Sequence, residues 1–316
     1  MAAKLAFIGC GAMGAPIAER LIDAGYDVRI YDPSAAATAP LVERGATAAG
    51  SPREAASDAE IAFACLPSPD ISRVVALGPD GIAGCKGLAV YIEMSTIGSR
   101  KVKEIAAGLN RAGIAMLDSP VSGGPRGARA GTLSTMAAGD RAAFDKAKPF
   151  LETIARNVFY VGDTPGLGQI TKLANNMISA AGMAAAFEAS AMAVKAGVDA
   201  RVLIDTVNAS TGRNSATMDK FPASVLTRSF DYGGRLSIMY KDVFLCLEEA
   251  RELNVPMWIG SNVVQLWFHA VTEGRGNEDF TALIKMIENW AGVVVGGNES
   301  GSVPAESHNR KNPRGK

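Results

Sequence analysis

The first half of the chain alternates short apolar runs with longer segments that mix apolar and polar residues. The short runs are rich in β-branched and aromatic residues and are typical of buried strands. The expected strands are Lys4–Ile8, Asp27–Asp32, Glu60–Leu66, Leu88–Met94 and Ile114–Asp118, with Leu133–Ala138 and Val158–Val161 as additional strands. The intervening segments, for example 12–24, 99–111 and 140–154, predict helices. This alternation favours a largely parallel sheet with helices on both faces.

The pattern changes near residue 165. From Gly168 to Ala196 there is no proline and little β-branching, which predicts one helix of roughly 40 Å at ~1.5 Å per residue. The remainder predicts helices only, at Arg201–Asn208, Leu236–Leu253, Trp258–Thr272 and Phe280–Ile287. We therefore expect a first domain over 1–164, a helical domain over 165–297 that begins with an interdomain helix at 165–196, and a polar, disordered tail over 298–316.

A glycine-rich turn follows the first expected strand directly. Gly9, Gly11 and Gly14 form a G-x-G-x-x-G pattern, with Ala12 and Met13 between the last two glycines. The pattern lies between a strand and a helix, which is the context that the dinucleotide fingerprint requires. Its glycines permit a tight turn, close approach of a pyrophosphate and close helix packing, and the helix N-terminus attracts phosphate. A structural turn without a cofactor is the alternative.

The second expected strand ends in an acid, Asp32. A carboxylate at this position can accept hydrogen bonds from the adenosine ribose hydroxyls and would repel a 2′-phosphate. Pro33 and Ser34 follow it, so no arginine stands there to accommodate that phosphate. We expect NAD as the preferred cofactor, with NADP possible.

Composition and charge exclude several classes of function. Lys plus Arg equals Asp plus Glu at 32 each, so no net basic field attracts nucleic acid or an anionic membrane. The four cysteines have no metal-like spacing, and no metal site is expected. The N-terminus enters the first strand at once, without a signal peptide, and 178–194 reads as too polar and too short to span a membrane. These features indicate a cytoplasmic protein.

Lys172 is the best candidate for acid–base chemistry. Neither histidine, His269 or His308, has an obvious acid partner in the sequence, so another group must handle a proton. Lys172 and Asn176 are spaced i,i+4 and share one helix face, where both can reach one small polar ligand. A solvated surface lysine is the usual alternative, but the neighbouring glycines and apolar residues disfavour it.

Other candidate residues stand where expected strands end, and ligands of open α/β sheets bind outside the carboxyl ends of strands. Ser122, Gly123 and Gly124 offer a hydroxyl and unobstructed N–H groups that suit a carboxylate; a flexible surface loop is the alternative. Cofactor contacts are expected from Leu66 and Pro67 and from Ser95 and Thr96, although a capping role for Ser95 or Thr96 fits equally well. Lys241 could reach the cofactor or the substrate, or pair with Glu248 or Glu249 at poor spacing.

Together these blocks resemble the β-hydroxyacid dehydrogenase family, which includes 3-hydroxyisobutyrate dehydrogenases, tartronate semialdehyde reductases and serine or threonate dehydrogenases. The matching residues run in the family's order from about residue 4 to 295: Gly9-x-Gly11-x-Met13-Gly14, Ser95-Thr96-Ile97, Asp118-Ser119-Pro120-Val121-Ser122-Gly123-Gly124, Gly166-x-Gly168-x3-Lys172-x3-Asn176 and Lys241-Asp242. One departure is Tyr232-Gly233-Gly234-Arg235, where many members carry a phenylalanine near Gly234, so the substrate pocket could have a different shape.

The resemblance implies an α/β Rossmann-type N-terminal domain and an all-α C-terminal domain joined by a long interdomain helix. It implies that Lys172 is the catalytic acid/base, that Ser122, Gly123, Gly124 and Asn176 hold the substrate, and that Lys241 lines the site. Family members are usually homodimers or homotetramers, and the expected substrate is a small 3-hydroxy acid oxidised reversibly by hydride transfer.

Three alternatives remain at this point. Imine reductases resemble the family in fold but commonly have another residue where Lys172 stands. The 6-phosphogluconate dehydrogenases resemble the chain around Ser122 and Lys172 but are much longer. A non-catalytic NAD-binding protein would have no need for both Lys172 and Asn176.

Overall fold

The computed structural model describes residues 2–297 and 301–302. The chain divides into two compact units, and each unit is built from two stretches of sequence. Among the described residues, the first unit comprises 2–176 and 244–256, and the second comprises 177–243 and those from 257 onward. The divisions fall inside helix α8 (Leu167–Lys195), inside helix α10 (Leu236–Glu252) and just after α10, whereas the sequence predicted one boundary at residues 164 and 165.

The first unit contains a nine-stranded sheet within the described residues. Its strands are β1 (Lys4–Ile8), β2 (Asp27–Tyr31), β3 (Thr47–Ala48), β4 (Ile61–Ala64), β5 (Val90–Glu93), β6 (Ala115–Asp118), β7 (Val121–Ser122), β8 (Leu133–Gly139) and β9 (Ala155–Gly162). Their order is β3-β2-β1-β4-β5-β6-β8-β7, with β9 beside β8. Strands β1 to β6 pair in parallel, and β8 runs antiparallel to β6 and β7. This confirms the largely parallel sheet.

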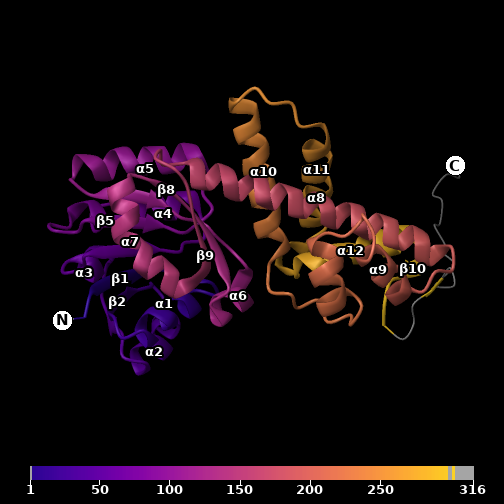
Figure 1. The fold of residues 1–316 in the computed structure, drawn as a ribbon, viewed down its shortest axis with the longest axis horizontal. Coiled ribbons are helices and arrows are strands. Elements are labelled where there is room, and N and C mark those ends of the chain that lie inside the picture. Colours follow the sequence, from indigo (N-terminus) through magenta and orange to yellow (C-terminus); the bar gives the residue numbers. More distant parts are fainter. Residues whose placement is uncertain (1, 298–300, 303–316) are drawn as a thin grey trace, which may run out of the picture. The chain divides into compact units, whose positions relative to one another are not determined.

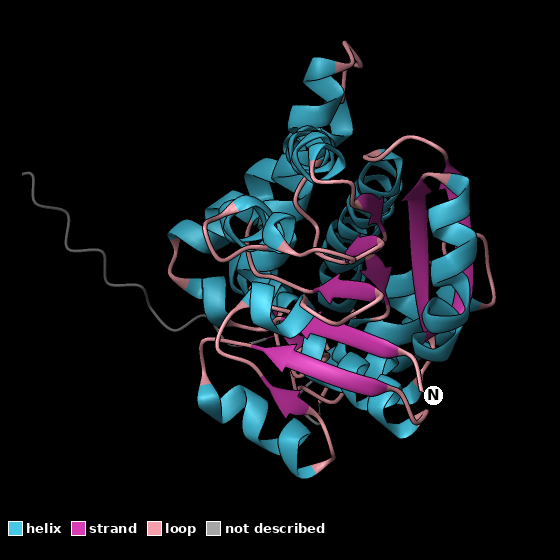
Figure 2. Cartoon of the chain, turned by 90° about the vertical axis from the view of Figure 1, so that its left-hand side faces the viewer, coloured by secondary structure: helices cyan, strands magenta, loops and turns pink. Residues whose placement is uncertain are grey.

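Helices cover both faces of this sheet (Figures 1 and 2). They are α1 (Gly14–Asp23), α2 (Ala35–Glu43), α3 (Pro52–Ala56), α4 (Pro69–Leu77), α5 (Ser99–Arg111), α6 (Gly124–Ala130) and α7 (Arg141–Ile154), with a 3₁₀ turn at η1 (Ile82–Gly84). Side chains alternate across a strand. Leu5 and Phe7 of β1 accordingly join one core with residues of α1 and α7, whereas Ala6 and Ile8 join a second core with residues of α4 and α5.

The second unit is mainly helical. After the C-terminal part of α8 it contains α9 (Ala200–Asn208), the π-helix η2 (Ala216–Val225), the first part of α10, α11 (Trp258–Thr272), η3 (Arg275–Asn277), η4 (Phe280–Leu283) and α12 (Ile284–Ala291). The prediction of helices only is wrong in one place, because β10 (Val293–Val294) pairs antiparallel with β11 (Gly301–Ser302). Residues 301–302 therefore form a short strand, and the rest of the predicted tail lies outside the described residues.

Helix α8 is one continuous helix of 29 residues (Figure 1). By length and composition it could cross a membrane, with a mean hydropathy of 1.5 in its most apolar window. The prediction that this segment is too short and too polar to span a membrane is therefore wrong on that test, because the helix extends well beyond residues 178–194. Within the same window 56% of the helix is buried inside the protein, which fits a core helix.

Candidate active site

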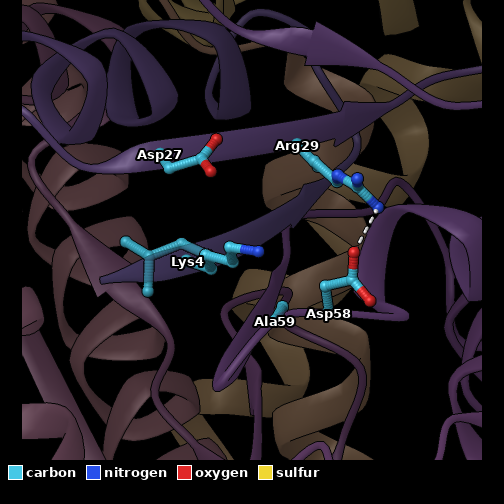
Figure 3. Close-up of a pocket in the computed structure, with 6 residues that line it drawn as sticks. Lys4, Asp27, Arg29, Asp58 and Ala59 are labelled. Carbon is cyan, nitrogen blue, oxygen red and sulfur yellow. Dashed lines mark ion pairs between the residues drawn. The ribbon is translucent and has the colours of Figure 1, made fainter. Parts of the chain in front are cut away.

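The amino and carboxyl ends of the parallel strands differ in how well they could bind a ligand. At the amino ends a small cavity of about 10 Å³ is lined by Lys4, Asp27, Arg29 and Asp58, and Arg29 forms an ion pair with Asp58 at 3.3 Å (Figure 3). That volume suits about one water molecule. The glycine-rich loop, by contrast, lies at the carboxyl edge, between the ends of β1 and β4, where the direction of the strand order reverses. Nucleotides bind at this switch point in doubly wound folds.

The glycine-rich loop has the geometry of a dinucleotide cradle. A Cβ on Gly14 would overlap the carbonyl oxygen of Gly9, so only glycine lets α1 lie this close to the turn. Gly9 has φ +92°, and a Cβ there would overlap the carbonyl oxygen of Cys65. Gly11 faces open space, with no atom within 4 Å of the place that a Cβ would take. The loop is therefore tight on its protein side and open on the side where a pyrophosphate would approach.

The start of α1 carries no side-chain cap in the described residues. The helix begins at Gly14, two residues later than predicted, because Ala12 and Met13 form a turn. Met13 holds the N-cap position without a capping hydrogen bond, and the first turn contains no acid. Helix N-termini have backbone N–H groups without intrahelical partners and a positive dipole end. This end of α1 therefore fits a phosphate.

Asp32 follows β2 at the carboxyl end of the sheet and bonds to two turns, the glycine-rich loop and the turn that precedes α2. Its Oδ2 accepts a hydrogen bond from the Cys10 N–H at 2.8 Å, and its Oδ1 accepts one from the Ser34 N–H at 2.9 Å. A carboxylate has about four acceptor positions, so Asp32 retains capacity for ribose hydroxyls. Burial, followed by the Asp32 charge, raises the pKa of the Cys10 thiol to about 12, so this thiol is not a nucleophile at neutral pH.

The ends of β4 and β5 are held together by Ser95. Ser95 is buried, and its Oγ accepts a hydrogen bond from the Leu66 N–H at 2.7 Å. Thr96 is partly exposed, and Pro67 is exposed. The structure thus joins the segments that contain four of the residues predicted to contact the cofactor, and the Ser95 hydroxyl bonds to the protein's own loop.

Glu93, the last residue of β5, is a buried acid that the sequence analysis missed. Its Oε1 accepts a hydrogen bond from the Ser95 N–H at 3.0 Å, and its Oε2 accepts one from the Tyr91 hydroxyl at 3.0 Å. Burial raises the pKa of Glu93 to about 7, although the hydrogen bonds from Ser95 and Tyr91 lower it in part. The only sequence signal was an acid at the end of an otherwise apolar strand.

Replacing Glu93 by glutamine should stabilise the protein at alkaline pH. The folded pKa of about 7 lies above the ordinary 4.5, so the contribution of Glu93 to stability is complete below pH 4.5 and is lost as the pH rises through 7. The amide can accept from Ser95 and donate to the Tyr91 hydroxyl, which can act as donor or acceptor. We expect Glu93→Gln to gain up to about 3 kcal/mol near pH 8 and nothing near pH 4. Urea denaturation at both pH values measures this, and a variant less stable than the parent at pH 8 contradicts it.

Asp118, at the end of β6, fixes the start of α8. Its Oδ1 accepts a hydrogen bond from the Gly166 N–H and its Oδ2 accepts one from the Gln169 N–H, each at 2.8 Å. Burial raises the pKa of Asp118 to about 6 against the lowering effect of these bonds. A Cβ on Gly168 would lie 2.7 Å from Asp118 Oδ2, so glycine permits this approach. The first turn of α8 is therefore attached directly to the carboxyl edge of the sheet.

Gln169 adds a second attachment from the same turn. Its Oε1 accepts hydrogen bonds from the Ile97 N–H at 2.8 Å and the Gly98 N–H at 3.2 Å, and its Nε2 donates to the Ser95 carbonyl at 3.0 Å. The fully buried amide thus satisfies three backbone groups of the segment that contains Thr96. The sequence analysis missed Gln169, because its partners lie more than 70 residues away.

Lys172 and Asn176 follow on the same helix and are both buried, with 8% and 7% of their surface exposed. The Asn176 Oδ1 accepts a hydrogen bond from the Asn175 side chain at 3.1 Å. The spacing i,i+4 places Lys172 and Asn176 on one face. A buried lysine contradicts the solvated-surface alternative and is uncommon unless the group has a partner or a function.

The predicted substrate loop is more ordered than a flexible surface loop. Ser122 ends β7, which pairs with β8, and Gly124 begins α6. Gly123 has φ +130° and Gly124 has φ +62°, conformations that favour glycine. Ser122 is partly exposed and both glycines are exposed, so their N–H groups and the hydroxyl stand at the surface of the first unit.

The remaining predicted residues belong to the second unit. Lys241 lies on α10 with its Nζ 2.8 Å from Asp242 Oδ1, rather than paired with Glu248 or Glu249. Glu249 instead accepts hydrogen bonds from the N–H and the hydroxyl of Ser99. His269 is exposed and stacks on Trp290, and His308 lies outside the described residues.

Two family models match the chain. Residues 4–162 match the NAD binding domain of 6-phosphogluconate dehydrogenase. Residues 166–287 match the NAD-binding domain of NADP-dependent 3-hydroxyisobutyrate dehydrogenase. The two matches meet at the start of α8, close to the predicted boundary.

Known relatives extend over nearly the whole chain. The chain is 34% identical to 2-(hydroxymethyl)glutarate dehydrogenase of Eubacterium barkeri, over 94% of this chain and 98% of the relative. It is 32% identical to 3-sulfolactaldehyde reductase of Escherichia coli, over 93% of this chain and 98% of the relative. The solved structure of Mycobacterium tuberculosis 3-hydroxyisobutyrate dehydrogenase with L-serine is 30% identical, covers 90% of this chain and 99% of that chain, and has a TM-score of 0.83.

Proposed function

Because this chain belongs to the β-hydroxyacid dehydrogenase family and is an oxidoreductase that uses a nicotinamide dinucleotide, we propose that it interconverts a small 3-hydroxy acid and its 3-oxo acid or semialdehyde, with Lys172 as the acid/base. The observation that carries the proposal is the buried Lys172–Asn176 face on a helix whose first turn is attached to the carboxyl edge of the sheet. At that edge the glycine-rich loop fits a pyrophosphate.

Lys172 moves the proton of the reaction. In oxidation its neutral amine accepts the hydroxyl proton, and in reduction its ammonium returns that proton to the carbonyl oxygen. When bound, the nicotinamide accepts or supplies the hydride. Asn176, one turn further along α8, orients the amine and the substrate oxygen by hydrogen bonds. Burial of both side chains keeps water away from the proton transfer.

Ser122, Gly123 and Gly124 hold the substrate carboxylate in this proposal. Ser122 is partly exposed and the two glycines are exposed, so we propose that the Ser122 hydroxyl and the two glycine N–H groups donate to the carboxylate. Lys241 is proposed to line the site on the basis of the family pattern Lys241-Asp242. Its ammonium would add positive charge where the acid binds.

We propose NAD rather than NADP as the preferred cofactor. The Asp32 carboxylate accepts hydrogen bonds from the loop N–H groups of Cys10 and Ser34, so its negative charge is held close to the ribose position. A 2′-phosphate brought there would meet like charge. Steady-state kinetics with both cofactors checks this: we expect kcat/KM to be higher with NAD, and to shift toward NADP in Asp32→Ser.

The function is tested by following NADH with a panel of substrates. NADH formation reports oxidation of the 3-hydroxy acids 3-hydroxyisobutyrate, L-serine and 2-(hydroxymethyl)glutarate, and NADH consumption reports reduction of 3-sulfolactaldehyde, because relatives carry these names. Cyclic imines and 6-phosphogluconate serve as the competing classes. Turnover of the 3-hydroxy acids supports the proposal. Tight NAD binding without turnover of any panel member contradicts it and favours a non-catalytic protein.

We also propose a cytoplasmic homodimer or homotetramer. Trp258 and Ile259, adjacent on α11, are 84% and 71% exposed, and large exposed apolar side chains that lie together are typical of protein contact surfaces. The mass in solution, measured by light scattering, checks the oligomer.

A further inference from the structure

One buried side chain of the first unit links the two segments on which the proposed mechanism depends. Gln169, in the first turn of α8, is fully buried. Its amide oxygen accepts two hydrogen bonds from backbone N–H groups of residues 95–98, and its amide nitrogen donates to a backbone carbonyl of the same segment. This segment contains two predicted cofactor contacts, and α8 carries Lys172 three residues after the glutamine. All of these residues belong to the first compact unit.

The segment 95–98 is buried but has no regular structure of its own. It lies between β5 and α5, and its residues Ser95 and Ile97 have only 4% and 2% of their surface exposed. Buried backbone N–H and C=O groups outside helices and strands need partners from elsewhere in the protein. Gln169 is the partner of three such groups. The position of the segment therefore depends on this glutamine.

The Gln169 side chain is not needed to begin the helix. Asp118 already accepts hydrogen bonds from the N–H groups of Gly166 and Gln169, donors of the kind that a helix start leaves without intrahelical partners. The Gln169 side chain bonds instead to backbone groups 71 to 74 positions earlier in the chain. An apolar side chain of similar size would fill the same space without these bonds. The amide is therefore explained by the link to 95–98 rather than by the fold of α8.

Helix α8 transmits the position of Gln169 to Lys172. The two residues are spaced i,i+3, and Asn176 follows at i,i+7, so the three side chains share one helix face. At a rise of ~1.5 Å per residue, the backbones of Gln169 and Lys172 are about 4.5 Å apart along the helix axis. A shift of the first turn therefore moves the amine as well. Misplacement of reacting groups by about 1 Å can lower a rate by about 10²-fold.

We propose that Gln169 is a positioning residue, which holds the helix that carries Lys172 at a fixed distance from the cofactor segment 95–98. Gln169 moves no proton itself and acts through Lys172. The inference rests on the proposed function, in which the Lys172 amine exchanges a proton with the substrate.

A double-mutant cycle with Lys172→Ala tests the role of Gln169. Gln169→Met keeps the size of the side chain and removes its three hydrogen bonds. We expect it to lower kcat about 10- to 100-fold and to change the affinity for NAD less than about threefold. In the Lys172→Ala background the same change should lower kcat by less than about a further twofold, because no amine remains to be positioned. Two losses of kcat that multiply would show that Gln169 does not act through Lys172, and would overturn the proposal.

Asp140→Ala is the matched structural control. It removes the hydrogen bond that caps α7 in the same unit, so it should destabilise the protein and keep the kcat of the parent. If Gln169→Met does not fold, Gln169→Glu enters the same cycle, because it keeps the acceptor for the two N–H groups and loses only the donor. Equal losses of kcat in Asp140→Ala and in the Gln169 variant would assign the effect to stability and contradict the positioning role.

A readout that needs no turnover separates this inference from the proposed function. In protein labelled with ¹³C-lysine, the Cε resonance of Lys172 is identified by its loss in Lys172→Ala. A Gln169 variant should shift that resonance, and Asp140→Ala should leave it in place. If the parent turns over no panel substrate, or if Lys172→Ala turns over normally, the proposed function fails while the resonance still tests the positioning. A resonance that does not move in the Gln169 variant overturns the inference, whatever the activity.

Discussion

Replacing Lys172 by alanine should lower kcat by two to four orders of magnitude and leave the affinity for NAD nearly unchanged. General acid–base catalysis contributes on the order of 10²–10⁴-fold, and this variant removes the group proposed to carry the proton. Lys172 lies on α8, whereas the glycine-rich loop and Asp32 belong to the β1–α1–β2 region, so cofactor binding should persist. Stopped-flow measurement of hydride transfer checks the loss of rate. Quenching of the protein's tryptophan fluorescence during a titration with NAD checks the affinity for the cofactor.

A matched control is Lys146→Ala, which removes an exposed lysine from α7 of the same unit. It should keep the activity of the parent. Partial recovery of Lys172→Ala by added methylamine would support the proton-transfer role, because a small amine can occupy the space of the missing one. Near-normal turnover in Lys172→Ala would reject the assignment.

Two glycine-to-alanine changes in the cofactor loop should have opposite consequences. In Gly14→Ala the new methyl group would overlap the carbonyl oxygen of Gly9, so α1 must move away from the turn, and we expect a loss of more than about 3 kcal/mol in the free energy of unfolding. In Gly11→Ala the methyl group meets open space, so the fold should persist. That methyl group would occupy the approach of the pyrophosphate, and we expect NAD affinity to fall at least roughly tenfold.

Denaturant titration and NAD binding measured on both variants distinguish these outcomes. A stable Gly14→Ala protein would show that α1 can shift without cost. Unchanged NAD affinity in Gly11→Ala would show that the dinucleotide does not approach this face of the loop.

The sequence predicted the elements that depend on local pattern. Strand β1, the glycine turn and α1 show a change from the two-residue period of a strand to the 3.6-residue period of a helix. Helix α8 contains no proline and few β-branched residues, so its length could be predicted as well. Elements with little pattern were missed. The π-helix at Ala216–Val225 has no diagnostic period and contains Pro222, and β7 and β3 are two residues long. Residues 121–131 contain four glycines, which hid the helix α6.

The same distinction applies to the site. Gly11, Lys172 and Ser122 could be named because their neighbours in sequence form a recognisable spacing. Glu93 and Gln169 could not, because their significance comes from burial and from partners brought together by the fold. Asp118 was noted only as the first residue of a family block, and its attachment to Gly166 and Gln169 emerged from the structure.

The bonds from Asp118 to the first turn of α8 have a consequence for native-state dynamics. The amide hydrogens of Gly166 and Gln169 end on a carboxylate of β6 rather than on helix carbonyls. Helix ends ordinarily fray and exchange these hydrogens with solvent quickly. Here the Asp118 carboxylate holds both hydrogens, so we expect their deuterium uptake to be slower than at an ordinary helix end and to report the release of the Asp118 side chain from the start of α8.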